Sequence, residues 1–282
     1  MRVVHDIEEM RAISQKARAE GKTVGLVPTM GALHSGHIEL ARRAREECGI
    51  VIMSIFVNPI QFGPNEDYEA YPRTLKADAE LAEEAGVDYI FAPDAKQMYP
   101  KEPLTSVDVG KLTEHLCGAS RPGHFRGVAT VVAKLFNITR PHRAYFGMKD
   151  AQQLRVLIRM NEDLNFGITI VPVPTVREAD GLAISSRNTY LSREDRLRAV
   201  VLSRSLKLAE RLVASGELDA GKIKSAMRDL IMSEVPDALI DYVEIVDDDT
   251  VQPIDKVDGK ALVALAVRIG GTRLIDNVTV KA

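Results

Sequence analysis

The sequence predicts a doubly wound α/β protein that carries a smaller α+β domain at its C-terminal end. Short apolar segments alternate with helix-like segments over the first part of the chain, and the pattern changes near Thr175. Strands that alternate with helices are typical of a parallel sheet covered by helices. We therefore expect an N-terminal domain at 1–175 and a C-terminal domain at 176–282.

In the N-terminal part, apolar runs bounded by glycine and proline indicate strands, and apolar residues spaced three and four apart indicate helices. The run at 50–57 is almost wholly apolar and β-branched, as expected for a strand buried on both faces of a parallel sheet. The expected strands are 24–29, 50–57, 87–92, 143–146 and 168–173. The expected helices are 7–20, 38–48, 75–85, 128–138 and 151–164.

The C-terminal part begins with a long, charged amphipathic segment at 192–214 that predicts one helix. Ser192 is its expected N-cap, and Glu194 and Asp195 fall in its first turn, where negative charge is favourable. A second helix is expected at 222–234. Strands of a small, mainly antiparallel sheet are expected at 241–246, 261–269 and 273–280.

Composition excludes several classes of function. The formal net charge is −3 and there is no Trp, which argues against a protein that coats nucleic acid or stacks bases on aromatic side chains. The two cysteines, Cys48 and Cys117, are far apart, so neither a disulfide framework nor a cysteine metal site is expected. The N-terminal segment MRVVHDIEEM lacks the apolar core of a signal peptide, and no apolar run reaches the ~18 residues of a membrane span. We expect a cytoplasmic protein without membrane contact.

The stretch PTMGALHSGHIEL, residues 28–40, follows the first buried strand and leads into a helix. Ligands of parallel α/β sheets bind beyond the carboxyl ends of the strands, and a helix N-terminus favours phosphate. His34 and His37 could donate hydrogen bonds to phosphate oxygens there. Two imidazoles without a third nearby ligand are a weak metal site. A glycine-containing turn with two exposed histidines is the alternative without a binding role.

Four later loops carry polar side chains that could complete such a site. The loop 56–74 offers the amides of Asn58 and Gln61, which could instead satisfy the turn itself. Its acidic residues Glu66, Asp67 and Glu69 are expected on a solvated face. The segment SRPGHFRG, residues 120–127, places two arginines and a histidine before a helix. That is a favourable place for an anion, with a surface turn as the alternative.

The segment YFGMKDAQQLR, residues 145–155, repeats the order of strand, glycine turn and helix. Lys149 could neutralise phosphate charge there, Asp150 is the expected N-cap, and Gln152 and Gln153 add amides. The last loop, 175–192, contains Ser185-Ser186-Arg187-Asn188, whose arginine suits a bidentate grip on phosphate. A surface turn and an interdomain linker are the respective alternatives.

The order His34-Ser-Gly-His37 after a first strand resembles the HxGH signature of nucleotidyl-transferring α/β enzymes. The blocks PTMGALHSGH, SIFVNPIQFGPNEDYEAYPRT, RPGHFRGVATVVAKLFNITRP, AYFGMKDAQQLRVL, VPTVREADGLAISSRN and TRLIDN together resemble the pantothenate synthetase family, the ligases that join pantoate and β-alanine. They occur in family order and cover nearly the whole chain. The resemblance implies a Rossmann-like N-terminal domain.

The resemblance also implies a two-step reaction. The pantoate carboxylate attacks the α-phosphorus of ATP to give pantoyl adenylate and pyrophosphate. The amine of β-alanine then attacks the activated acyl carbon and releases AMP and pantothenate. Mg²⁺ accompanies ATP through the phosphates, so no protein ligand to the metal is expected. The family's usual assembly implies a homodimer formed through the N-terminal domain.

The residues implied by the resemblance fall into three groups. His37, His34 and Lys149 would be catalytic, with His37 carrying the family's proton-donor role. Gln61 and Gln153 would bind pantoate, and Gln61 would also lie near β-alanine. ATP would be bound by Met30, Gly31, Ala32, Leu33, His34, Ser35, Gly36, His37, Gly147, Met148, Lys149, Asp150, Val176, Ile184, Ser185, Ser186 and Arg187.

Met148 and Ile184 depart from the residues that many family members carry there, which puts only side-chain roles at these positions in doubt. The sequence does not decide whether His37 donates a proton or only stabilises charge. Two other functions share part of the pattern. One is a nucleotidyltransferase that stops after transfer, and the other is a non-catalytic nucleotide- or RNA-binding module.

Overall fold

The computed structural model describes residues 1–64 and 66–282. The chain folds into two compact units. Unit 1 comprises Met1–Val109, Arg121–Met148 and Gln153–Pro174. Unit 2 comprises Gly110–Ser120, Lys149–Gln152 and Thr175–Ala282. The predicted domains 1–175 and 176–282 stay a prediction.

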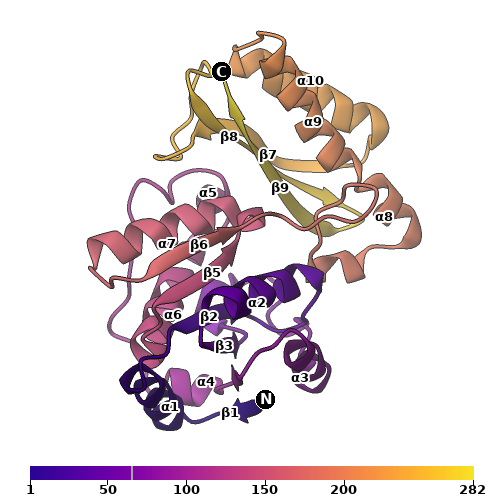
Figure 1. Ribbon diagram of the computed structural model, residues 1–282. Helices are drawn as coiled ribbons and strands as arrows, with labels where there is room; N and C mark the ends of the chain where they lie inside the picture. Colours follow the sequence, from indigo (N-terminus) through magenta and orange to yellow (C-terminus); the bar gives the residue numbers. More distant parts are fainter. Residues whose placement is uncertain (65) are drawn as a thin grey trace. The chain divides into compact units, whose positions relative to one another are not determined.

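Unit 1 is built around a six-stranded sheet in the order β1-β4-β3-β2-β5-β6, with every adjacent pair parallel (Figure 1). The strands are β1 (Arg2–Val4), β2 (Val24–Thr29), β3 (Ile50–Ile55), β4 (Tyr89–Phe91), β5 (Arg143–Gly147) and β6 (Thr169–Val173). The chain moves from β2 to β3 on one side and from β5 to β6 on the other. The strand order therefore reverses between β2 and β5, where sheets of this type bind ligands. The predicted doubly wound parallel sheet is confirmed.

The register of the sheet places two site loops next to each other. The pairing of β2 with β3 runs from Val24 opposite Ile50 to Thr29 opposite Ile55. Because both strands end at the same level, the segments that begin at Met30 and Phe56 leave the sheet from neighbouring positions.

The helices of unit 1 are α1 (Ile7–Ala19), α2 (Ser35–Glu47), α3 (Leu75–Glu84), α4 (Ala95–Met98), α6 (His124–Thr139) and α7 (Ala151–Asp163), whose first two residues belong to unit 2. Helices α2 and α3 cover one face of the sheet. The core there contains Leu40, Ala44, Ala82, Val27, Met53 and Ile90. Helix α6 is buried along most of its length, which its apolar sequence predicts.

Unit 2 contains an antiparallel sheet of β7 (Leu239–Asp247), β8 (Lys260–Ile269) and β9 (Thr272–Lys281), as predicted. Its helices are α5 (Cys117–Ser120), α8 (Arg193–Arg198), α9 (Val201–Ala214) and α10 (Ala220–Glu234). Helices α9 and α10 lie side by side against the sheet (Figure 1). The core between them includes Leu202, Leu206, Ile223, Met227, Val243, Ile245, Val263 and Leu265.

The prediction of a single helix at 192–214 is wrong, because the structure has two helices there, α8 and α9. Ser192 does cap α8, accepting a hydrogen bond from Asp195 N. The chain then turns before α9, and Ala199, Val201 and Leu202 are all at most 2 % exposed. Residues 199 and 201 would lie on opposite sides of a straight helix, so the turn lets all three enter the core.

Other differences are at element ends. Helix α6 begins at His124, four residues before the predicted start, so this histidine lies in the helix and not ahead of it. The short 3₁₀ turns Pro59–Gln61, Met148–Asp150 and Ser186–Tyr190 were not predicted.

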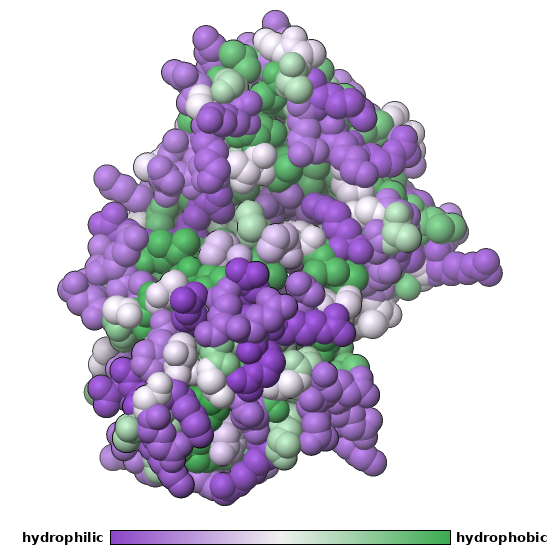
Figure 2. Space-filling model, in the orientation of Figure 1, coloured by the Kyte–Doolittle hydropathy of each residue, from purple (hydrophilic) through white to green (hydrophobic). Residues whose placement is uncertain are grey.

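The visible face of the protein is largely hydrophilic, with hydrophobic residues in small patches (Figure 2). Across residues 1–64 and 66–282, no helix has the length and apolar character needed to cross a membrane.

Candidate active site

His34 and His37 lie at the start of α2 and hold each other in place. His34 is the N-cap residue, and its Nδ1 accepts a hydrogen bond from Gly36 N at 3.2 Å. His37 Nδ1 accepts from His34 N at 3.4 Å, which completes a reciprocal capping box. The two rings stack, with centroids 4.0 Å apart and planes 28° apart.

This arrangement fixes the tautomer of each neutral ring. Because both Nδ1 atoms accept from backbone N–H groups, the proton of each ring lies on Nε2. In the neutral form, each imidazole is therefore a donor through Nε2. The sequence predicted phosphate donors here, but it did not predict that the histidines cap their own helix.

Gln61 is buried, at 8 % exposure, in the 3₁₀ turn after β3. Its Oε1 accepts from Asn58 Nδ2 at 3.0 Å, and its Nε2 contacts Met30 Sδ at 2.9 Å. Asn58 also donates to Gly127 O at 3.1 Å and accepts from Tyr99 Oη at 2.8 Å. The amide of Asn58 thus supports the turn and orients Gln61, as the alternative without a binding role expects, and ligand binding by these amides stays a prediction.

Gly127 is what allows α6 to pack against this turn. A Cβ at Gly127 would lie 2.3 Å from Ile60 O and 2.6 Å from Gln61 Cα. The backbone of one of the two elements would have to move to make room for a side chain. The glycine in SRPGHFRG that ends the block therefore sets the position of Gln61.

Two of the basic side chains of SRPGHFRG, those of Arg121 and His124, already have partners inside unit 1. Arg121 makes two 2.6 Å hydrogen bonds to the carboxylate of Glu66 and a 3.0 Å contact with His124 Nε2. His124 Nδ1 lies 2.8 Å from Gln61 O. The guanidinium of Arg121, one of the groups predicted to attract an anion, therefore binds a carboxylate of the protein, and Glu66 lies in an ion pair and not on a solvated face.

The electrostatics of Glu66 follow from this pair. Burial would raise the pKa of its carboxyl, but the hydrogen bonds and charge of Arg121, with a hydrogen bond from Gly63 N, lower the pKa from 4.5 to about 2. Glu66 stays ionised at neutral pH, and the pair ties the 56–74 loop to the start of α6.

Lys149 lies half-buried in the 3₁₀ turn Met148–Asp150, which leads directly into α7. Its backbone oxygen accepts a hydrogen bond from Asn277 Nδ2 at 2.8 Å, so strand β9 holds this turn. Gln152 is buried and serves the fold, because its amide bonds Cys117 N, Leu112 O and His115 O. Gln153 is half-buried in α7.

The segment 176–187 of unit 2 forms a narrow turn followed by a 3₁₀ turn. Ile184 N donates to Val176 O at 3.0 Å, and Arg177 pairs with Ala183 in an antiparallel bridge. Ser185 caps the 3₁₀ turn through a 3.3 Å hydrogen bond from Arg187 N. One of the two predicted phosphate-binding hydroxyls therefore already accepts a backbone hydrogen bond.

This segment is tied to β9 by a buried ion pair. Arg177 donates to both oxygens of Asp276, at 2.7 Å and 2.9 Å. Asp276 is 3 % exposed, and burial of this kind requires a charged partner. Strand β9, which contains the TRLIDN block, thus holds both the Lys149 turn and the 176–187 segment.

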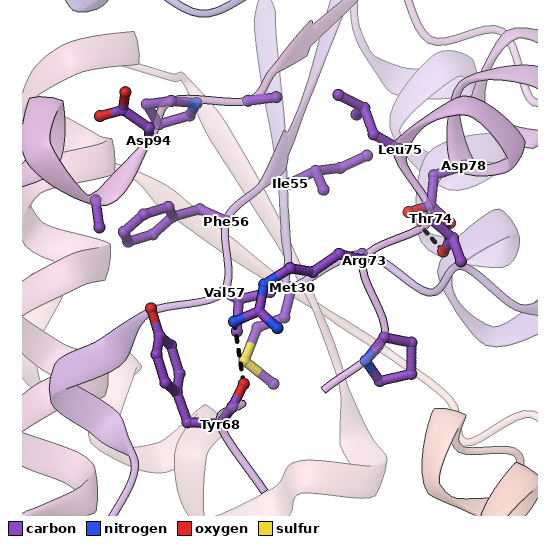
Figure 3. A pocket seen from close by; sticks show the side chains of 15 residues that line it. Met30, Ile55, Phe56, Val57, Tyr68, Arg73, Thr74, Leu75, Asp78 and Asp94 are labelled. Carbon is purple, nitrogen blue, oxygen red and sulfur yellow. Dashed lines mark hydrogen bonds between the residues drawn. The ribbon is translucent and has the colours of Figure 1, made fainter. Parts of the chain in front are cut away.

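Unit 1 also contains a pocket of about 340 Å³ at the carboxyl ends of β2, β3 and β4 (Figure 3). Met30, Phe56 and Tyr68 line it, and the side chain of Arg73 crosses it. The Arg73 guanidinium donates to the backbone oxygens of Tyr68, Glu69 and Tyr71 and lies 5.2 Å from the Tyr68 ring centre. Sequence reasoning missed this pocket. The unusual length and the aromatic residues of the 56–74 loop were the available signal.

The sequence of unit 1 and unit 2 together matches one family model. The model for pantoate-beta-alanine ligase covers residues 2–279. The chain belongs to the pantoate–β-alanine ligase family.

Several known proteins match this chain over all or nearly all of their length. The pantothenate synthetases of Caldicellulosiruptor saccharolyticus and Heliobacterium modesticaldum are each 58 % identical over 281 residues, covering 100 % of both chains. The crystal structure of pantothenate synthetase from Thermus thermophilus is 48 % identical, with a TM-score of 0.92 and 99 % of each chain covered. Pantoate-beta-alanine ligase from Francisella tularensis, crystallised with beta-gamma ATP and beta-alanine, is 34 % identical. Its TM-score is 0.82, and 99 % of this chain and 97 % of that chain are covered.

Membership of the pantoate–β-alanine ligase family confirms the resemblance and the ligase class that the sequence predicted. It favours a ligase over a transferase that stops after the first step and over a non-catalytic binding module. Within residues 1–64 and 66–282, no cluster of three or more His, Cys, Asp or Glu side chains could hold a metal ion.

Proposed function

We propose that this protein joins pantoate to β-alanine with the use of ATP, through a pantoyl-adenylate intermediate. The observation that carries the proposal is the match to the ligase family over residues 2–279, which contains every loop described above. The stacked pair of histidines at the start of α2 supports it, because adenylate formation needs hydrogen-bond donors where phosphate charge develops.

In the first step, an oxygen of the pantoate carboxylate bonds to the α-phosphorus of ATP, and pyrophosphate leaves. Phosphoryl-type transfer asks mainly for positioning and charge stabilisation. The Nε2–H groups of His34 and His37 donate to phosphate oxygens, and Lys149 adds a positive charge. The tautomer fixed by the capping box lets His37 act as a neutral donor. Transfer of its proton is not required.

The rest of the proposed ATP site comes from segments that lie far apart in the sequence. The loop Met30–His37 and the turn Gly147–Asp150 contact the nucleotide, Val176 packs against adenine, and Ile184–Arg187 contacts the phosphates. Mg²⁺ would be held through the ATP phosphates and not by side chains of the protein, because this ion keeps several waters and takes few protein ligands.

Pantoate is held by the amides of Gln61 and Gln153. Asn58 orients Gln61. Its side-chain NH₂ group donates to Gln61 Oε1, and the Nε2 group of Gln61 then faces Met30. In the second step, the β-alanine nitrogen bonds to the acyl carbon near Gln61. The carbon–oxygen bond to AMP breaks, and the amine loses a proton.

The proposal extends to the assembly and location of the protein. We expect two functional domains, 1–175 and 176–282, a homodimer formed through the first, and a cytoplasmic enzyme without nucleic-acid or membrane partners. Sedimentation equilibrium tests the dimer, because a homodimer has twice the 31.0 kDa mass of the chain.

The test of the reaction is pantoate-dependent exchange of labelled pyrophosphate into ATP, followed by β-alanine-dependent release of AMP. The ligase shows exchange with pantoate alone and forms pantothenate when β-alanine is added. Exchange without any amide product would favour the transferase. ATP binding without turnover of any carboxylic acid would favour the binding module.

A variant pair tests the pantoate site. Gln61→Ala should raise the KM for pantoate by about tenfold or more, in the range of about 1–3 kcal/mol for a lost buried hydrogen-bond partner. Gln15→Ala, an exposed glutamine on α1, is the matched control. Unchanged pantoate kinetics in Gln61→Ala would remove Gln61 from the site.

A further inference from the structure

Asp78 is a buried carboxylate on α3 that no motif in the sequence singled out. It is 2 % exposed. Its Oδ1 accepts a hydrogen bond from Leu33 N at 2.8 Å, and its Oδ2 accepts from Ala32 N at 3.1 Å. The hydroxyl of Thr74 lies 3.2 Å from both oxygens, and Figure 3 shows this contact at the edge of the pocket.

The backbone that Asp78 holds has an unusual conformation. Gly31 has φ +82° and Ala32 has φ +49°, so two successive residues lie in the left-handed region. Glycine adopts this conformation freely, whereas alanine rarely does, so the surroundings must maintain it at Ala32. A Cβ at Gly31 would lie 3.0 Å from Asp78 Oδ2, so the carboxylate also approaches the glycine closely.

The held turn immediately precedes the catalytic pair. Leu33 is followed by His34, the N-cap of α2, and the capping box links His34 to His37. A change in the turn at Gly31–Leu33 would therefore change where α2 begins and where both imidazoles lie. Both oxygens of Asp78 accept from groups of the protein, and a carboxylate would repel the phosphates of ATP. Its chemistry thus suits holding the loop and does not suit contact with the nucleotide.

We propose that Asp78 is a positioning residue for adenylate formation, and that it fixes the Gly31–Leu33 turn so that the imidazoles of His34 and His37 meet the α-phosphate region in the reactive geometry. This inference rests on the proposed function, because the step that Asp78 affects is adenylate formation. A displacement of about 1 Å at a reacting group can cost about 100-fold in rate.

The test compares two variants with the same chemical change. Asp78→Asn keeps the size of the side chain but places an NH₂ group against one of the two backbone N–H groups. Asp88→Asn is the control. The Asp88 carboxylate also accepts from a backbone amide, Val51 N at 2.7 Å, and pairs with Arg45. It does so just before β4, at the amino end of the strands and away from the site loops.

Steady-state pyrophosphate exchange is measured below the unfolding temperature of each variant. Asp78→Asn should lower kcat about 100-fold, while KM for ATP and pantoate stays within about threefold. Asp88→Asn should lower the unfolding temperature and leave kcat within about twofold of the parent. Equal kcat for Asp78→Asn and the parent would overturn the inference, and so would an equal loss of kcat in the two variants. No exchange by the parent protein would contradict the proposed function itself.

Amide hydrogen exchange on the parent protein keeps the inference testable if Asp78→Asn does not fold. The amides of Ala32 and Leu33 should exchange far more slowly than those of the exposed segment around Leu104, which is 96 % exposed. Exchange of both amides at the rate of that segment would show that Asp78 does not hold the turn, and would overturn the inference.

Discussion

Two buried aspartates hold the site loops of the two units by different chemistry. In unit 1, Asp78 accepts from two backbone amides of the loop that precedes His34. In unit 2, Asp276 accepts two hydrogen bonds from the guanidinium of Arg177, in the segment that precedes Ser185. Both carboxylates are at most 3 % exposed.

The difference lies in what each carboxylate fixes. Bonds to backbone amides fix φ and ψ directly, so Asp78 sets the geometry of its loop. Bonds to a guanidinium fix the end of a long side chain, so Asp276 tethers its segment strongly while the backbone can still move. A fixed loop suits the two histidines, which we propose stabilise the transition state.

The largest expected effect concerns the fixed loop. His37→Ala should lower kcat for adenylate formation by about 10²–10³-fold and change ATP binding far less, because its donor acts where phosphate charge develops. His142→Ala is the control, since its imidazole accepts from Val24 N at the amino end of the strands. A loss confined to ATP binding, with an unchanged chemical step, would remove His37 from the transition state.

Loss of the ion pair that tethers the 176–187 segment should lower the stability of the protein. Arg177→Met leaves the buried Asp276 carboxylate without its guanidinium and should lower the free energy of unfolding by about 3 kcal/mol. Arg196→Met is the matched control, because Arg196 pairs with the more exposed Asp180 and should cost at most about 1 kcal/mol. Urea denaturation measures both, and equal losses would show that the Arg177 pair is an ordinary surface pair.

Unit 1 also contains a carboxylate bonded to a guanidinium, in the ion pair of Glu66 with Arg121. Because the pKa of Glu66 is lowered from 4.5 to about 2, the pair contributes stability above pH 4.5 that is lost as pH falls toward 2. The side chains are 25 % and 14 % exposed, so solvent screening limits the contribution to on the order of 1–2 kcal/mol. Thermal unfolding of the parent and of Glu66→Gln should differ at about pH 7 and converge toward pH 2. A constant difference would contradict this assignment.

The smallest expected effect concerns the Lys149 turn. Asn277→Ala removes the donor to Lys149 O and should lower the free energy of unfolding by about 1 kcal/mol and raise KM for ATP a few-fold. Asn137→Ala removes a similar side-chain bond, to Ala133 O on α6, and should leave KM for ATP unchanged. Equal KM values in the two variants would separate Asn277 from the nucleotide site.

The sequence by itself determined the sheet and indicated the loops to which we assign the chemistry. Apolar runs such as 50–57 and the glycine-rich ends of strands are local signals, and they placed most elements within a few residues. Local patterns failed where burial competes with periodicity, as at the turn between α8 and α9, where three nearly consecutive residues enter the core. The six blocks in family order identified the ligase.

Only the tertiary structure decided what holds these loops. Asp78 lies at least 45 residues along the chain from the backbone amides that donate to it, and Asp276 lies 99 residues from Arg177. Arg121 was predicted to attract an anion, but Glu66 occupies its guanidinium from a loop 55 residues away. Such contacts depend on which segments the folded sheet brings together, and no local spacing in the sequence reports them. The histidines of HxGH were visible in the sequence, whereas the carboxylate that positions them was not.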